Sequence, residues 1–194
     1  MLRPHSALAG LCALLGVAAC GRERDKATDA RQPNFSVYEL DSKWRDASGR
    51  PRALSSMRGR PQVLALIYTS CTSVCPITVA IMQQVEARVG DRAGYLLVSL
   101  DPDRDSPARL AEFAKEHQLS ARWTLLSGAE PDVRELAAVI GVQYRRVTSG
   151  QIDHTTSLTI LDADGRVVAQ HKDEHAGDEA VRTLMRMAPG AGSQ

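Results

Sequence analysis

The sequence is poor in aromatic residues and carries almost no net charge. Phe, Trp and Tyr make up only 4% of the 194 residues, so the core must rest on Leu, Val, Ile and Ala. Lys and Arg number 24 and Asp and Glu 23, which leaves a net charge of +1. Without a basic excess the chain has no electrostatic footprint for nucleic acid, and we expect no such partner. Four cysteines are too few for a disulfide-built miniprotein but are enough for one specific site.

The chain also lacks an apolar run long enough to span a membrane. The run from Ala7 to Ala19 is shorter than the about 20 residues that a spanning helix needs, and it is typical of a signal-peptide core. Arg3 and His5 precede this run, and Cys20 directly follows small residues, as in a bacterial lipobox. Ordinary secretory cleavage and an uncleaved short anchor are the alternatives. We favour a lipoprotein signal peptide at residues 1–19 with lipid on Cys20.

The residues after this leader predict one tethered domain. Residues 20–34 carry charge, Ala and Thr without large apolar side chains up to Pro33, as a flexible tether should. Hydrophobic residues at 43% and charged residues at 24% are typical of a globular protein, and the length suits one domain. We place that domain at residues 35–188 and a disordered tail at 189–194. The mature protein is expected outside the cytoplasm, on the periplasmic side, anchored to a membrane by its lipid.

The hydrophobic pattern alternates between strands and helices. Strands are predicted at residues 35–40, 62–68, 95–100, 123–126, 142–147, 157–161 and 166–171, and helices at 76–89, 107–117, 132–140 and 176–187. The run QVLALIY from Gln62 to Tyr68 is almost continuously apolar, which indicates a strand buried on both faces. No internal repeat is evident. Strands alternating with helices, followed by a terminal hairpin and helix, predict an α/β fold with a mixed sheet.

Several turn and cap signals set the element boundaries. Pro76 and Pro107 are predicted at first helical positions, where proline loses no hydrogen bond, and Ser106 is the expected N-cap of the second helix. Gly141 is expected to end the third helix. The segment 162–165, Asp-Ala-Asp-Gly, is expected to turn the last two strands into a hairpin.

Two cysteines four residues apart follow the first buried strand. If residues 1–19 are removed and Cys20 carries lipid, Cys71 and Cys75 are the only free thiols. A helix N-terminus stabilises thiolate over thiol, and thiolates are soft donors that select Cu(I), Zn and iron–sulfur clusters. A structural disulfide that staples the loop is the alternative. Because so short a bridge would remove little entropy from the unfolded chain, we favour a functional pair for redox exchange or metal binding.

A third ligand would complete such a site, and imidazole is a usual choice. His154 lies in a polar connection just before a strand, where a side chain can reach another loop. His117 is expected near a helix C-terminus, and His171 and His175 flank a charged run. Position alone favours His154 over these three without excluding them.

Three sequence blocks resemble the Sco (SenC) copper-chaperone family of thioredoxin-fold proteins. They are YTSCTSVCP at 68–76, SLDPDRDSP at 99–107, and DHTTS at 153–157 ahead of LDADG at 161–165. Their order and spacing cover nearly the whole mature domain. Many family members have Pro where this chain has Thr72 and an acidic residue where it has Ser73, so the redox tuning of the pair can differ.

The resemblance implies a thioredoxin-like fold, with a central mixed sheet flanked by helices and an N-terminal β extension. It also implies that Cys71, Cys75 and His154 bind one copper ion, as Cu(I) and also as Cu(II) with an added oxygen ligand. The implied clients are the apo form of the copper-bearing subunit of cytochrome c oxidase or another copper protein. The implied reductant of the cysteine pair is a thioredoxin-like protein.

Two functions use this cysteine pair. The first is a membrane-tethered metallochaperone that passes copper to a binuclear copper centre by ligand exchange, and this is the function we favour over an enzymatic one. The second is a thiol–disulfide reductase that keeps the cysteines of a copper-site apoprotein reduced; it needs Cys71 and Cys75 but not His154. A thiol peroxidase has little support, since no proline precedes Cys71 in its loop. Asp101, Asp103 and Asp105 are expected in loop and cap roles rather than as outer contacts of the metal.

Overall fold

The computed structural model describes residues 35–148, 150–172 and 175–187. The predicted signal peptide, Cys20 with its tether, and the tail at 189–194 lie outside these residues. The nine strands are β1 Trp44–Asp46, β2 Pro51–Arg52, β3 Gln62–Ile67, β4 Gly94–Ser99, β5 Trp123–Gly128, β6 Tyr144–Arg146, β7 Ile152–His154, β8 Leu158–Leu161 and β9 Val167–His171 in the described part of the chain. The helices there are α1 Val74–Val89, α2 Pro107–Glu116, α3 Glu130–Val139 and α4 Ala176–Arg186, with short 3-10 turns at Val37–Glu39, Leu54–Met57 and Gly90–Arg92.

Seven strands form one mixed sheet in the order β2-β1-β5-β4-β3-β8-β9. The three central strands β3, β4 and β5 are parallel, whereas β1, β8 and β9 run antiparallel to their neighbours. Strands β6 and β7 form a separate hairpin, in which Tyr144 pairs with His154. The parallel centre places the ends of β3 and β4 at one edge of the sheet, where sites gather in open α/β folds.

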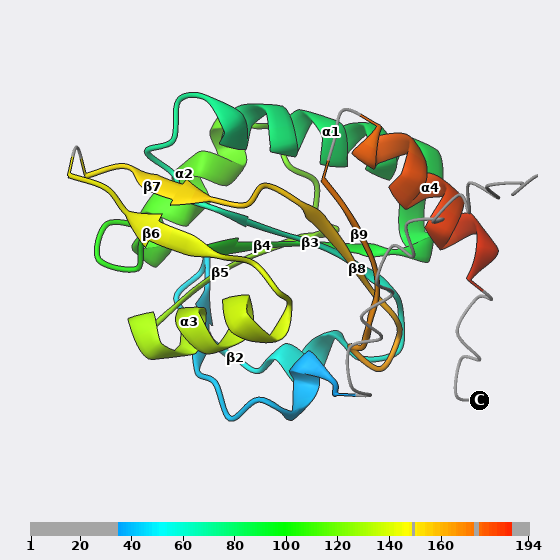
Figure 1. Cartoon of the computed structure of the whole chain (residues 1–194), viewed down its shortest axis with the longest axis horizontal. Helices are drawn as coiled ribbons and strands as arrows, with labels where there is room; N and C mark the ends of the chain where they lie inside the picture. Colours follow the sequence, from blue (N-terminus) through cyan, green and yellow to red (C-terminus); the bar gives the residue numbers. More distant parts are fainter. Residues whose placement is uncertain (1–34, 149, 173–174, 188–194) are drawn as a thin grey trace, which may run out of the picture. The chain divides into compact units, whose positions relative to one another are not determined.

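Helices cover both faces of this sheet. Figure 1 shows α1 and α4 together on one face and α3 on the opposite face, with the β6–β7 hairpin beyond the ends of the central strands. This explains why every residue of β3 and of β4 is buried, as parallel strands covered on both faces require. In the described segments, no helix combines the length and apolar character needed to cross a bilayer.

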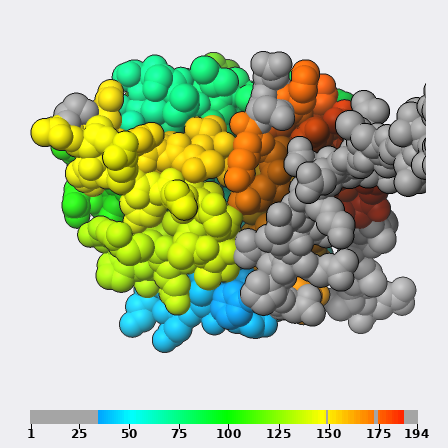
Figure 2. Space-filling view, in the orientation of Figure 1, coloured from blue at the N-terminus to red at the C-terminus, as the bar shows by residue number. Residues whose placement is uncertain are grey.

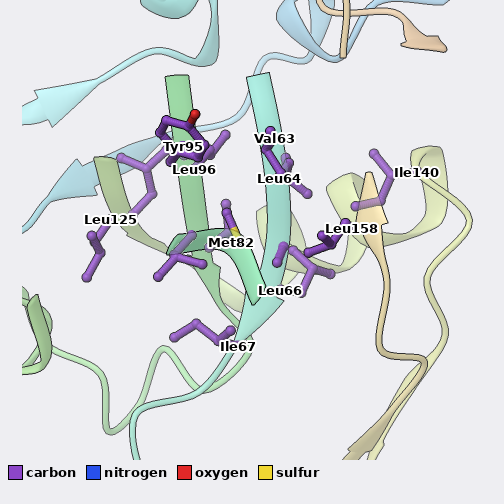
Figure 3. Packing of buried hydrophobic residues seen from close by; sticks show 14 of the residues in the cluster. Val63, Leu64, Leu66, Ile67, Met82, Tyr95, Leu96, Leu125, Ile140 and Leu158 are labelled. Carbon is purple, nitrogen blue, oxygen red and sulfur yellow. The ribbon is translucent and has the colours of Figure 1, made fainter. Parts of the chain in front are cut away.

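The core is aliphatic, as the low aromatic content indicates. Figure 3 shows Leu64 and Ile67 of β3 and Leu96 of β4 among the packed side chains, with Met82 of α1 entering from the helical layer. All four are almost completely buried. Helix α1, which contains Cys75, is therefore fixed to the sheet by its own apolar face, and the loop before it, which carries Cys71, is held at a defined place.

Most predicted elements are confirmed, with shifted ends. The buried strand at 62–68, the helix capped by Ser106, and the hairpin turn at 162–165 are found. The Ser106 hydroxyl accepts a hydrogen bond from the Arg109 N–H, and Gly165 adopts φ +83° in the turn. The predicted mixed α/β class is confirmed as well, and the β1–β2 pair at the sheet edge supplies the expected N-terminal β extension.

Two local predictions are wrong. Residues 35–40 were expected as a strand, but Val37–Glu39 is a 3-10 turn, because the Ser36 hydroxyl accepts the Tyr38 N–H and caps it. Helix α1 begins at Val74 rather than at Pro76. Pro76 is tolerated as the third helical residue, since the first four N–H groups of a helix have no partner within it. Cys75 therefore lies inside the first helical turn.

Candidate metal centre

The two cysteines lie where β3 passes into α1. A turn in which the Cys71 N–H donates to the Tyr68 carbonyl oxygen at 3.1 Å brings the first thiol back toward the helix. The Cys75 N–H donates to the Cys71 sulfur at 3.4 Å. Ser73, the N-cap residue, makes no capping bond with its side chain, so the Cys71 sulfur accepts an N–H of the first turn in its place. Both cysteines are free thiols and are buried, with Cys71 6% and Cys75 1% exposed.

These surroundings shift the pKa values of the two thiols in opposite directions. Burial alone would raise the pKa of Cys71, but hydrogen bonds from the Cys75 thiol, from the Cys75 and Ser73 N–H groups and from the Tyr68 hydroxyl lower that pKa to about 7. For Cys75, burial raises the pKa well above its ordinary range, and its hydrogen bond to the Cys71 sulfur and the nearby Asp105 carboxylate raise it further. Near neutral pH the pair therefore combines a Cys71 thiolate with a Cys75 thiol that donates a hydrogen bond to it. This arrangement suits nucleophilic attack on a disulfide or binding of a metal ion.

We expect alkylation of the reduced, metal-free protein to show this inequality. Iodoacetamide reacts with the thiolate, so the rate at Cys71 should rise through a midpoint near pH 7 and fall below it as the sulfur is protonated. Cys75 should stay unreactive over the same range, since its pKa is raised. Mass spectrometry of the alkylated peptides measures both rates. A Cys71 midpoint at the ordinary thiol value of about 8.5 would contradict this interpretation.

His154 approaches the cysteine loop from the β6–β7 hairpin. Its ring stands edge-on to the Tyr68 ring, with centroids 6.2 Å apart and planes at 76°. Neither imidazole nitrogen, though buried, has a hydrogen-bond partner among the described residues. The neighbouring Thr155 N–H donates to the Gln143 carbonyl oxygen instead. Burial lowers the pKa of His154 more than the nearby Thr155 backbone and Asp153 carboxylate raise it, so the ring is neutral at physiological pH, which is the form that ligates metals.

A cavity of about 360 Å³ joins the hairpin to the start of α1. Its lining residues are Tyr68, Ser73, Val74, Val147, Gln151, Ile152, Asp153, His154 and Thr156. Figure 2 shows the same adjacency on the surface, where the yellow atoms of the hairpin meet the teal atoms around the start of α1. Tyr68 forms the wall between the two sides and contacts both Cys71 and His154. The sequence carries no signal for this role of Tyr68 beyond its place at the end of a buried strand.

The structure brings the two cysteines together but leaves His154 apart from them. In the described residues, no three His, Cys, Asp or Glu side chains are arranged closely enough to hold a metal ion. The donor set nevertheless fits a soft cation: one sulfur lies in the loop before α1 and the other in its first turn, and an imidazole with two unused nitrogens lines the adjoining cavity. Closing the site therefore requires His154 or the cysteine loop to move across the space beside Tyr68.

The other histidines serve elsewhere. His117 caps α2 and packs against Phe113 with ring centroids 4.2 Å apart. His171 contacts Glu179 through Nδ1 at 2.8 Å and Thr183 through Nε2 at 3.3 Å. His175 lies at the start of α4. His117, His171 and His175 do not line the cavity beside the cysteine loop, whereas His154 does.

The three aspartates after β4 divide into buried and exposed. Asp105 and Asp101 are 0% and 1% exposed and accept several hydrogen bonds, whereas Asp103 is exposed. The expectation of loop and cap roles holds for the backbone turn, in which the Asp101 carbonyl oxygen accepts the Arg104 and Asp105 N–H groups. The side chains of Asp105 and Asp101 also have a role that this expectation does not include. Asp105 accepts hydrogen bonds from Thr69 in the cysteine loop, and Asp101 accepts them from Arg146 in the β6–β7 hairpin.

Comparison with known proteins places these residues in a family context. The SCO1 protein homolog of Bacillus subtilis is 26% identical over 171 residues, which cover 84% of this chain and 84% of the relative. Among solved structures, copper-bound ScoI of Bradyrhizobium japonicum is 25% identical, with a TM-score of 0.66, and the match covers 76% of this chain and 97% of that one.

Two further structures share the fold at lower identity. A SCO1/SenC family lipoprotein of Bacillus anthracis is 22% identical with a TM-score of 0.70, covering 77% of this chain and 95% of that one. BsSco, a member of the Sco family of cytochrome c oxidase assembly proteins in which a disulfide switch is identified, is 22% identical with a TM-score of 0.68, covering 79% and 94%. The expected thioredoxin-like fold of this family is thereby confirmed.

The match to a family model covers most of the chain. The model for SCO1/SenC matches residues 34–189, which include the cysteine loop, the buried aspartates and the hairpin with His154. The family thus defined includes a lipoprotein and members linked to cytochrome c oxidase assembly. This chain belongs to the SCO1/SenC family.

Proposed function

We propose that this chain is a membrane-tethered, extracytoplasmic copper metallochaperone that binds one copper ion through Cys71, Cys75 and His154. The observation that carries the proposal is the pair of unpartnered, buried nitrogens on His154, which line the cavity next to a buried thiol pair. A buried polar group without a partner costs roughly 1–3 kcal/mol, so its retention beside two soft donors indicates a ligand that it meets in another state. Copper in the Bradyrhizobium relative supports the choice of cargo.

The two thiols bind the cargo in sequence. Cys71 presents a thiolate near neutral pH and makes the first contact, because its pKa is lowered to about 7. Cys75 must then lose its proton, so binding releases a proton and weakens as the pH falls. Neutral His154 completes a three-coordinate site suited to Cu(I), and an added oxygen ligand would suit Cu(II). A site of so few ligands lets a client's thiolates enter one at a time, so copper passes without becoming free.

The cellular setting is part of the same proposal. Lipid on Cys20, after removal of residues 1–19, would hold the domain to a membrane on the periplasmic side, and the Bacillus anthracis lipoprotein of this family supports it. The proposed client is the apo form of the copper-bearing subunit of cytochrome c oxidase or another copper protein. BsSco, from a family of oxidase assembly proteins, supports that direction.

A thiol–disulfide reductase is the second candidate, and the unequal thiols favour it. The Cys71 thiolate would attack a client disulfide and form a mixed disulfide, releasing one client thiolate. Cys75, deprotonated in that step, would attack Cys71 and release the second client thiolate. Two electrons pass to the client, and the Cys71–Cys75 pair becomes a disulfide that a thioredoxin-like dithiol must reduce again. Nothing in this cycle requires His154.

We therefore expect His154→Ala to separate the two functions. Loss of a direct ligand should weaken Cu(I) binding by more than the ~10–100-fold that loss of an outer contact causes. Reduction of a model disulfide by the same variant should keep its rate. Anaerobic Cu(I) titration against a competing chelator measures the first quantity and a thiol-exchange assay the second. The matched control is His117→Ala, which removes a histidine that ends α2 and does not line the cavity. Unchanged Cu(I) affinity in His154→Ala would refute the ligand assignment.

A further inference from the structure

A buried carboxylate lies directly behind the cysteine loop. Asp105 is 0% exposed and accepts the Thr69 N–H at 3.0 Å and the Thr69 hydroxyl at 2.5 Å. The Ser99 hydroxyl, at the end of β4, donates at 2.5 Å to Asp105 Oδ2, the oxygen that also accepts the Thr69 N–H. Thr69 stands two residues before Cys71. The loop that carries the first thiol is thus fastened to the carboxyl end of the sheet.

A second buried carboxylate lies beneath the histidine hairpin. Asp101 is 1% exposed, and Arg146 of β6 contacts both of its oxygens, at 2.8 Å and 3.5 Å. Arg104 contacts Asp101 at 3.5 Å and also donates to the Gly150 carbonyl oxygen in the hairpin turn at 3.3 Å. Asp101 therefore holds the hairpin from its strand and, through Arg104, from its turn.

One side chain links the two carboxylates. The Ser99 hydroxyl accepts the Asp101 N–H at 2.9 Å while it donates to Asp105. Ser99 itself is completely buried. A continuous polar chain thus runs from the loop of Cys71, through Asp105, Ser99 and Asp101, to the hairpin that carries His154. The contacts of Asp105 and Ser99 are shielded from water and are therefore stronger than surface contacts, whereas the Arg146 side chain that reaches Asp101 is partly exposed.

We propose that Asp101 and Arg146 are positioning residues that set where His154 stands relative to the cysteine pair; this inference rests on the proposed function. A hairpin of two three-residue strands is at best marginally stable alone and needs an external anchor. Arg146 pairs across the hairpin with Ile152, two residues before His154. The contact between Arg146 and Asp101 therefore holds the hairpin at a point close to His154 in the strand pairing.

The test is Arg146→Gln, which shortens and neutralises the anchor while leaving His154 and both cysteines in place. In the metal-free protein, hydrogen exchange should speed up at hairpin amides such as Val147, whose N–H donates to the Gln151 carbonyl oxygen. Cu(I) affinity should fall by about 10–100-fold, the range for outer contacts that orient a metal ligand. The pH midpoint of Cys71 alkylation should not move. Arg146→Lys, which keeps a cation opposite Asp101, should recover part of the affinity.

A matched control lies next to the anchor. Arg145 is an exposed arginine on the same strand, and it pairs only with Asp153 across the hairpin among the described contacts. Arg145→Gln should leave both hairpin exchange and Cu(I) affinity close to wild type. Arg104→Gln, which removes the contact to Gly150, provides a second route to the same loosening should Arg146→Gln unfold.

A double-variant cycle separates positioning from general weakening. In a His154→Ala background, Arg146→Gln should cause no further loss of Cu(I) affinity, because the residue that it positions is gone. An equal loss in both backgrounds, or hairpin exchange unchanged from wild type, overturns the positioning role. If exchange speeds up and Cu(I) affinity stays while His154→Ala loses copper, the anchor exists but does not position the ligand. Unchanged affinity in His154→Ala itself refutes the proposed ligand set, and the positioning role falls with it.

Discussion

Replacing Cys71 with serine is expected to abolish tight Cu(I) binding, so that a stoichiometry near one in the wild-type domain disappears. The serine hydroxyl is a hard donor that stays protonated at neutral pH. Cys71, in contrast, offers a soft thiolate near neutral pH because its pKa is lowered to about 7. One sulfur and one imidazole remain, and burial still raises the pKa of the Cys75 thiol above its ordinary value. Anaerobic titration with a Cu(I) chelator in competition measures the loss.

Two controls make this loss specific to the sulfur. Ser73→Ala removes a hydroxyl 3.9 Å from the Cys71 sulfur and should keep the wild-type stoichiometry. Serine at position 71 can still accept the Cys75 N–H, so the first turn of α1 should survive and the thermal midpoint should change little. A Cys71→Ser protein that is folded and still binds one Cu(I) with wild-type affinity would refute the proposed centre.

The parts of the fold that sequence predicts well are those in which local chemistry decides alone. The apolar run of β3 is buried on both faces wherever it pairs, and Ser106 followed by Pro107 starts a helix by its own hydrogen bond and φ angle. The wrong strand at residues 35–40 has the opposite cause. Ser36 captures a nearby N–H, and a local side-chain bond outweighs a weak alternating pattern.

The candidate site likewise has a part that local sequence predicts and a part that it does not. The spacing of Cys71 and Cys75 after a buried strand predicts a reactive pair, and the structure places Cys71 in the loop before α1 and Cys75 in its first turn. His154 could be favoured but not settled by position, because its place depends on a hairpin that pairs outside the main sheet. The anchoring of that hairpin by Asp101 depends on contacts 45 positions apart in the chain, and no local pattern predicts such contacts.

The largest effect on stability is expected from Asp105→Ala. Three donors lose their acceptor at once: the Thr69 N–H, the Thr69 hydroxyl and the Ser99 hydroxyl. A buried donor without a partner costs roughly 1–3 kcal/mol, and part of this sum is offset because a buried carboxylate no longer has to be desolvated. The free energy of unfolding should therefore fall by about 2–4 kcal/mol. Urea unfolding of the metal-free reduced domain measures this difference.

Asp103 supplies the matched control two residues away. Its side chain is exposed to solvent, so Asp103→Ala should change stability by less than about 0.5 kcal/mol. Asp105→Asn should lie between the two, since its amide oxygen in the Oδ2 position can still accept the Thr69 N–H and the Ser99 hydroxyl, while its NH₂ group faces the Thr69 hydroxyl. If Asp105→Ala is no less stable than Asp103→Ala, the buried carboxylate does not hold the cysteine loop. In that case a different contact must fix Thr69, and with it the position of Cys71 against the first turn of α1.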